Sequence, residues 1–151
     1  MKPFLLDSNV LIALFWPAHD HHEDAQRWFH SQPRLRWATC PLTQSAFVRI
    51  TSNPRFSRDA VSPREASERL AANLKNPQHR FLPADLAYGE ATSPFAERLR
   101  GHQQVTDGYL LGLAMHHRAM LSTFDTGILA LAPEGSATRR SLEILTVSRV
   151  D

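Results

Sequence analysis

Five short apolar segments, separated by longer stretches with helical spacing, are the strongest constraint on how this chain can fold. They cover residues 4–6, 37–40, 79–83, 119–124 and 143–147. Strands joined by helices rather than by tight turns pair in parallel, and the crossover helices then pack on the sheet faces. We therefore predict an α/β fold, with a small parallel β-sheet flanked by α-helices on both faces. The length of 151 residues suits one core, so we expect residues 1–151 to form a single domain.

The helices are predicted from apolar spacing and from signals at their ends. Ser62 and Pro63 mark one start, because serine caps helices and proline suits the first helical position. Residues 105–117 are apolar around most of the helix circumference, which predicts a largely buried helix. We expect helices over residues 8–15, 20–30, 44–51, from 62 onward, 93–100 and 105–117, while residues 84–92 show no decisive pattern.

The composition is that of a globular protein, with 42% hydrophobic and 21% charged residues. No apolar run approaches the roughly 20 residues that span a bilayer. The first strand follows Met1-Lys2 directly, so we expect no signal peptide, no membrane partner and a cytoplasmic location. Cys40 is the only cysteine, which excludes an internal disulfide and a thiolate cluster. The formal net charge of +2 does not by itself indicate a nucleic-acid-binding protein.

Three aspartates share a local context that brings them to one edge of the predicted sheet. Asp7 follows the strand at 4–6, and Asp125 follows the strand at 119–124. Asp107 lies in the first turn of the helix that leads into that second strand. Because this helix begins on the edge where the parallel strands end, Asp107 lies on that edge too. Gathered carboxylates need a cation, and oxygen-only ligands suit Mg²⁺ or Mn²⁺. Such an ion activates water and stabilises charge on a phosphodiester.

Each aspartate also has an ordinary structural explanation. Asp7 can cap the helix that follows it, and Asp107 can complement the dipole of its helix. Asp125 precedes Thr126-Gly127 and can form an Asx turn. These explanations do not require all three residues to share one sheet edge, whereas a metal site does.

Other polar and aromatic residues have two interpretations each. Arginines around the 44–51 helix and the loop after it can follow an RNA backbone or simply be solvated. Trp16 can form a partner surface at a helix end, and the histidine-rich tract at 19–23 is typical of a solvated helix start. His116 and His117 suit the dipole at a helix C-terminus. The arginines are Arg49, Arg55, Arg58 and Arg64.

The ordered set of acidic motifs resembles the PIN-domain nucleases, and most closely the VapC-type ribonuclease toxins of bacterial type II toxin–antitoxin pairs. The likeness is carried by Leu6-Asp7-Ser8-Asn9-Val10-Leu11, by Thr106-Asp107 with Tyr109-Leu110, and by Ser122-Thr123-Phe124-Asp125. Pro41-Leu42-Thr43-Gln44, with Arg49 and Asn53-Pro54, is similar to the third-helix region of those toxins. The resemblance extends over essentially the whole chain.

The resemblance implies a single PIN-like domain that cleaves RNA endonucleolytically with Mg²⁺ or Mn²⁺. It assigns the metal-binding and catalytic carboxylates to Asp7 and Asp107 first and to Asp125 next. Asn9 would orient a ligand, and Thr123 would be a polar neighbour of the metal-bound waters. The resemblance also implies a homodimer, and an antitoxin that packs on the helices and reaches into the acidic pocket.

Gln44 departs from the family pattern, because the family usually has a glutamate at this point of the third helix. A glutamine can ligate through its carbonyl oxygen or hold a metal-bound water, but it adds no negative charge. Two alternatives therefore stay open: a catalytically weak PIN-like module that binds RNA or a partner protein, and a phosphotransfer fold with Asp7 as nucleophile. The second lacks another acid at position 9 and a suitably placed lysine.

Overall fold

The computed structural model describes residues 2–148, so Met1 and residues 149–151 of the predicted domain lie outside the described part. It contains a five-stranded sheet in the order β3-β2-β1-β4-β5, in which every pair of neighbours is parallel. The predicted α/β fold with a small parallel sheet is confirmed. The strands are β1 (Phe4–Leu6), β2 (Trp37–Thr39), β3 (His79–Phe81), β4 (Met120–Thr123) and β5 (Leu142–Ile144).

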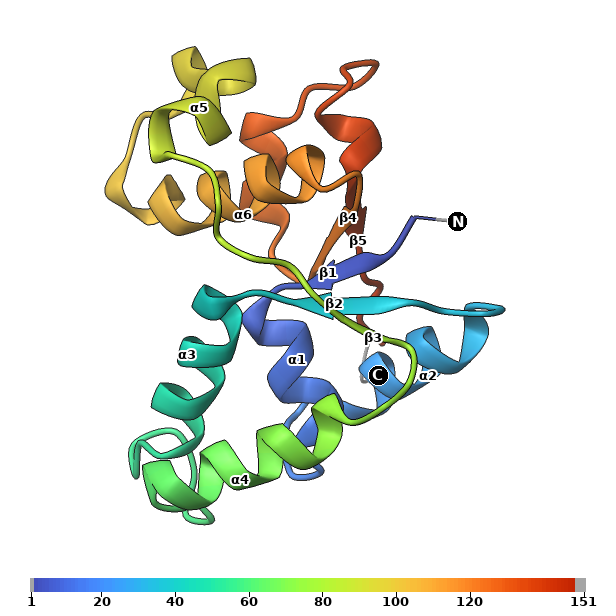
Figure 1. The fold of residues 1–151 in the computed structure, drawn as a ribbon, viewed down its shortest axis with the longest axis vertical. Coiled ribbons are helices and arrows are strands. Elements are labelled where there is room, and N and C mark those ends of the chain that lie inside the picture. Colours follow the sequence, from blue (N-terminus) through green and yellow to red (C-terminus); the bar gives the residue numbers. More distant parts are fainter. Residues whose placement is uncertain (1, 149–151) are drawn as a thin grey trace.

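Helices cover both faces of the sheet. In Figure 1, α1 to α4 lie on one side, and α5, α6 and the short 3-10 helices near the C-terminal end lie on the other. The α-helices are α1 (Ser8–Phe15), α2 (His22–Ser31), α3 (Pro41–Thr51), α4 (Pro63–Leu74), α5 (Tyr88–Thr92) and α6 (Val105–His116). The 3-10 helices span Ser93–Arg98, His102–Gln104, Thr126–Leu131 and Arg139–Ser141.

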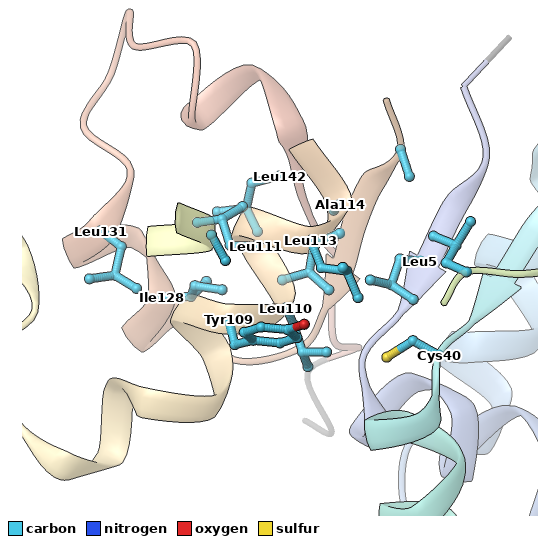
Figure 2. Close-up of a cluster of buried hydrophobic side chains, with 14 of the residues drawn as sticks. Leu5, Cys40, Tyr109, Leu110, Leu111, Leu113, Ala114, Ile128, Leu131 and Leu142 are labelled. Carbon is cyan, nitrogen blue, oxygen red and sulfur yellow. The ribbon is translucent and has the colours of Figure 1, made fainter. Parts of the chain in front are cut away.

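The alternation of side chains along each strand divides the core into two parts. Leu5 faces the layer of α5 and α6, whereas its neighbours Phe4 and Leu6 face the layer of α1 and α2. Figure 2 shows the α6 side, where Leu110, Leu111 and Leu113 fill the space against the sheet. Because both faces of the parallel sheet are covered, the central strand β1 is apolar at each of its three positions rather than at every second one.

Several element boundaries differ from the sequence predictions. Helix α3 begins at Pro41 instead of residue 44, because the Cys40 amide donates to the Thr43 hydroxyl and closes the helix start. Residues 93–98 form a 3-10 helix with a kink at Phe95 rather than a helix to residue 100. The segment without a decisive pattern is irregular up to Ala87, with a bend at Leu86, and then forms α5.

Trp16 does not form a partner surface, so this prediction was wrong. Only 4% of the residue is exposed. Its ring packs against Phe56 at 5.9 Å between centroids, and the Arg69 guanidinium lies over it. In the described part of the chain, no helix combines the length and the apolar character needed to cross a membrane.

The backbones of α5 and α6 approach each other closely at Gly112. A Cβ atom added to Gly112 would lie 2.0 Å from the carbonyl oxygen of Ala91. Glycine is therefore required here for the close approach of the two helices. By contrast, a Cβ atom added to Gly89 in α5 would meet nothing within 4 Å.

We predict that Gly112→Ala lowers the free energy of unfolding by at least about 1–3 kcal/mol, since the backbones of α5 and α6 must separate. Gly89→Ala is the matched control and should be neutral or slightly stabilising, because alanine is the better helix former. Urea denaturation of both variants measures the difference. Equal stability of the two variants would contradict the close packing of α5 on α6.

Candidate metal centre

The pairing of β1 with β4 positions the first part of the site. Leu6 is in register with Ser122, and the Asp7 amide continues the ladder by donating to the Ser122 carbonyl at 2.9 Å. Asp7 and Thr123 therefore sit side by side where the two strands end. Asp125 follows two residues after Thr123, and α6 leads into β4 from Asp107 in its first turn.

Thr123 is the centre of a hydrogen-bond network that fixes the Asp7 carboxylate. Its hydroxyl donates to Asp7 Oδ2 at 2.8 Å and accepts from the Asn9 amide group at 3.1 Å and from the Asp125 backbone N–H at 3.0 Å. The Asn9 carbonyl oxygen accepts from the Phe124 amide at 3.2 Å. Asn9 and Thr123 thus tie the start of α1 to the end of β4 and hold one carboxylate oxygen of Asp7 in place.

The three aspartates lie in one another's electrostatic field. Burial raises the pKa of Asp7, and repulsion from Asp125 raises it further, while the hydrogen bonds from Thr123 and Ser8 oppose both effects. Burial raises the pKa of Asp107 to about 6, with added repulsion from Asp7 and from Asp125. Within residues 2–148, none of these carboxylates has a salt bridge to a basic side chain. A bound cation would offset the repulsion among these carboxylates.

The ordinary structural roles of two of these aspartates are also present. Asp7 Oδ1 accepts from the Ser8 amide at 2.7 Å and so caps α1, and Asp125 Oδ1 accepts from the Gly127 amide at 2.8 Å in an Asx turn. No hydrogen bond to the Asp107 side chain occurs within the described residues, so both of its oxygens are free for a ligand.

The three carboxylates do not converge on one point. Over the described part of the chain, the oxygens of Asp7, Asp107 and Asp125 do not all come within 4.8 Å of one another. Mg²⁺ commonly binds through one or two carboxylates and retains several waters, which bridge to further groups. The donor set, which consists of carboxylate oxygens, therefore suits a hard cation that keeps some of its waters.

Gln44 faces the neighbouring strand end rather than hydrogen-bonding to the aspartates. Its amide group donates to the Thr39 hydroxyl at 2.9 Å, and the same hydroxyl lies 2.7 Å from His79 Nε2. Thr39 ends β2 as Thr123 ends β4. Thr39 was not among the predicted site residues, although a polar residue at the end of an apolar strand is the signal that singled out Asp7.

The arginines suggested for RNA contact occupy different places. Arg49 lines a groove of about 320 Å³ together with Pro41, Ser45 and Thr106, the neighbour of Asp107. Arg55 and Arg58 are exposed in the connection between α3 and α4. None of these three has a salt bridge in the described part of the chain, whereas Arg64, the fourth arginine suggested for RNA contact, pairs with Glu68 at 3.2 Å. Arg49 is therefore the one that shares a groove with a residue next to the acidic site.

Comparisons with known proteins agree with this architecture. The PIN domain family matches residues 4–133, a range that contains Asp7, Asp107 and Asp125. Ribonuclease VapC38 of Mycobacterium tuberculosis (strain ATCC 25618 / H37Rv) is 39% identical over 143 residues, which cover 95% of this chain and 98% of the relative. The chain is a PIN-domain protein of the VapC family.

Solved structures show that the fold is shared at low sequence identity. VapC20 of Mycobacterium tuberculosis, a sarcin-ricin loop cleaving toxin, superposes with a TM-score of 0.63 at 17% identity, covering 85% of this chain and 95% of that one. A toxin–antitoxin complex from Klebsiella pneumoniae gives a TM-score of 0.58 at 16% identity, with 91% and 93% coverage. PIN-domain ribonucleases are generally dependent on divalent metal ions, which agrees with the carboxylate cluster of this VapC-family chain.

The raised pKa of Asp107 predicts how the metal-free protein responds to pH. The folded-state pKa of about 6 lies above the ordinary value of 3.8, so the stability that proton binding provides is complete below pH 3.8 and lost as the pH rises through about 6. Asp107→Asn removes this titration. In EDTA, the variant should match the wild type near pH 4 and have the higher melting temperature above pH 6.

A thermal denaturation series from pH 4 to pH 8 measures this crossover. Addition of Mg²⁺ at pH 7.5 should then raise the melting temperature of the wild type more than that of Asp107→Asn, because the ion relieves the same repulsion. A constant difference between the two proteins at every pH would contradict the carboxylate cluster.

Proposed function

We propose that residues 1–151 form one PIN-like nuclease domain that acts as an Mg²⁺- or Mn²⁺-dependent endoribonuclease, the toxin of a toxin–antitoxin pair. The observation that carries the proposal is the group of three aspartates that repel one another at the carboxyl ends of β1 and β4 without a basic partner among the described residues. The relationship to VapC38, which is named a ribonuclease, supports RNA as the substrate. The cytoplasm is the location where such a substrate is available.

In this proposal, some residues of the chain hold the cation and others orient the residues that hold it. Asp7, Asp107 and Asp125 hold the cation and are the catalytic carboxylates. When bound, a divalent cation supplies an activated water and stabilises the charge that develops on the scissile phosphate. Thr123 and Asn9 keep the Asp7 carboxylate in one orientation, and such supporting groups commonly contribute about 10–100-fold to metal affinity or activity.

Gln44 has an auxiliary role in this proposal. Its amide group is already engaged by Thr39, which leaves the amide oxygen as the atom that can accept a hydrogen bond from metal-bound water. Because the residue is neutral, the site carries three carboxylates, enough for one divalent ion. The phosphate of the substrate would then bring any further ion.

Arg49 is the best-placed residue to contact the RNA backbone, since its groove includes Thr106. Arg55 and Arg58 extend the positive charge along the exposed connection after α3. Arginine suits phosphate because its guanidinium donates two parallel hydrogen bonds. These contacts are independent of base sequence, so cleavage specificity would depend on the shape and exposed loops of the RNA.

The partners of this proposal are an antitoxin protein and a second copy of the chain. The toxin–antitoxin complex among the structural neighbours supports the antitoxin. A groove of about 650 Å³ lined by residues of α3 and α4, including Val48 and Leu70, offers an apolar surface for its tail next to Gln44. Exposed apolar side chains such as Tyr88 and Val105 support a homodimer contact on the opposite layer.

A catalytically weak module that binds RNA or a partner protein is the second candidate. Gln44 favours it, because a neutral residue there removes one negative charge from the usual set. The phosphotransfer alternative loses its basis, because the chain belongs to the PIN-domain family and position 9 is an asparagine.

The direct test is cleavage of RNA by the purified protein with and without metal. We predict cleavage with Mg²⁺ or Mn²⁺, none in EDTA, and a loss of at least about 100-fold in Asp7→Asn or Asp107→Asn, because each removes a charged ligand. Asp20→Asn, a change at an exposed aspartate, is the matched control and should cleave like the wild type.

Equal cleavage by the wild type and Asp7→Asn would overturn the assignment of the site. RNA binding without metal-stimulated turnover would favour the second candidate. In that case Gln44→Glu, which supplies the fourth carboxylate, is the variant in which cleavage should appear.

A further inference from the structure

A second group of metal-ligating side chains lies at the other end of α6. His117 Nε2 is 3.0 Å from Asp85 Oδ1, and His116 Nε2 is 3.6 Å from the same oxygen. The three ligand atoms all lie within 4.8 Å of one another, and over residues 2–148 no other trio of histidine, cysteine or acidic side chains does so.

The end of the helix explains how two consecutive histidines reach one carboxylate. Adjacent residues in a helix point about 100° apart and do not face each other. Here α6 ends at His116, His117 is the cap, and Arg118 turns into the left-handed region with a φ of 55°. The two rings consequently lie edge to face with 4.9 Å between their centroids, and both Nε2 atoms point to Asp85.

The surroundings of His117 Nε2 call for either a hydrogen atom or a metal ion on this nitrogen. This atom lies 3.0 Å from Asp85 Oδ1 and also 3.0 Å from the carbonyl oxygen of Pro83. Both neighbours are hydrogen-bond acceptors, so an unprotonated nitrogen would turn its lone pair toward two oxygens. Either a proton or a metal ion between these atoms satisfies the arrangement.

The spacing of the ligand atoms matches tetrahedral zinc. Ligands at about 2.0–2.1 Å from a tetrahedral ion are separated by about 3.4 Å, and the two observed N···O distances of 3.0 and 3.6 Å bracket this value. Two imidazoles with one carboxylate suit zinc rather than Mg²⁺, which prefers oxygen ligands only. His116 and Asp85 are about half exposed, which leaves room for a water or the Pro83 carbonyl as the fourth ligand.

We propose that Asp85, His116 and His117 form a zinc site that fastens the segment between β3 and α5 to the C-terminal end of α6. This segment and the first residue of α5 are already attached near the other end of the helix. The Tyr109 hydroxyl donates to the Leu86 carbonyl at 2.8 Å, and the Tyr88 hydroxyl donates to the Val105 carbonyl at 3.0 Å. The zinc site adds a third contact to these two hydrogen bonds and holds residues 85–88 along the length of α6.

This site is separate from the candidate metal centre. His116 lies nine positions after Asp107 in the helix, which corresponds to about 14 Å along the axis. The two ions would also differ in kind, since one site offers carboxylates and the other imidazoles. Mg²⁺ in excess therefore leaves the histidine site available to zinc.

The other histidine-rich segment supplies a matched control. His19 Nδ1 accepts from the His21 backbone amide at 3.0 Å, and His21 Nδ1 lies 3.5 Å from Asp24 Oδ2. These rings are engaged locally and do not converge on a common point. A double change, His19→Gln with His21→Gln, removes the same number of histidines as His116→Gln with His117→Gln.

The test is equilibrium dialysis of the full, untagged chain against Zn²⁺ in excess Mg²⁺, followed by metal analysis. The wild type, the His19/His21 double variant and Asp107→Asn should each retain about one zinc per chain. The His116/His117 double variant should retain none, and Asp85→Asn should bind zinc at least tenfold more weakly. Circular dichroism of each variant checks its fold, and Asp85→Asn carries the test if the double variant fails to fold.

Absence of zinc from the wild type would overturn the proposal, as would retention of zinc by the folded His116/His117 double variant or an unchanged zinc affinity in Asp85→Asn. Loss of zinc in the His19/His21 double variant or in Asp107→Asn would overturn it too, because the ion would then reside elsewhere. These outcomes do not depend on RNA cleavage, so the zinc site and the nuclease activity can fail independently.

Discussion

The parallel pairing of β1 with β4 is the constraint on which the proposed chemistry depends. The backbone bond from Asp7 to Ser122 extends the ladder one residue beyond β1, and it sets the Asp7 side chain beside Thr123. The Thr123 hydroxyl then fixes the Asp7 carboxylate and, through the Asp125 amide, the start of the next turn. One strand pair thus positions residues that are more than a hundred positions apart in the chain.

This arrangement places charge where a stable metal-free protein would avoid it. Asp7 is only 6% exposed, and the pKa of Asp107 rises to about 6 because burial and two neighbouring carboxylates disfavour its ionised form. Departures of this kind from ordinary stabilising patterns are typical of functional sites. The apolar layers on both sides of the sheet, including the tight contact of Gly112 with Ala91, hold the strand ends in place despite the repulsion.

Most of the architecture could be predicted from the sequence, because short apolar strands joined by helices allow few topologies. The placement of Asp7, Asp107 and Asp125 at one edge of the sheet could also be predicted, because it depends only on the parallel direction of the strands. The strand order could not be predicted, because the pairing of β1 with β4 is non-local. The burial of Trp16 was missed, since it depends on Phe56 and Arg69 from other elements. The convergence of His116, His117 and Asp85 depends on backbone angles at a helix end, which the sequence pattern does not encode.

The proposed function requires that Asp7, Asp107 and Asp125 share one divalent cation. Anomalous diffraction from a crystal grown with Mn²⁺ tests it directly, because it locates the ion without assuming its ligands. We predict one strong peak within coordination or single-water distance of Asp7, Asp107 and Asp125. A fully occupied manganese ion elsewhere, with no density between these three carboxylates, would contradict the account.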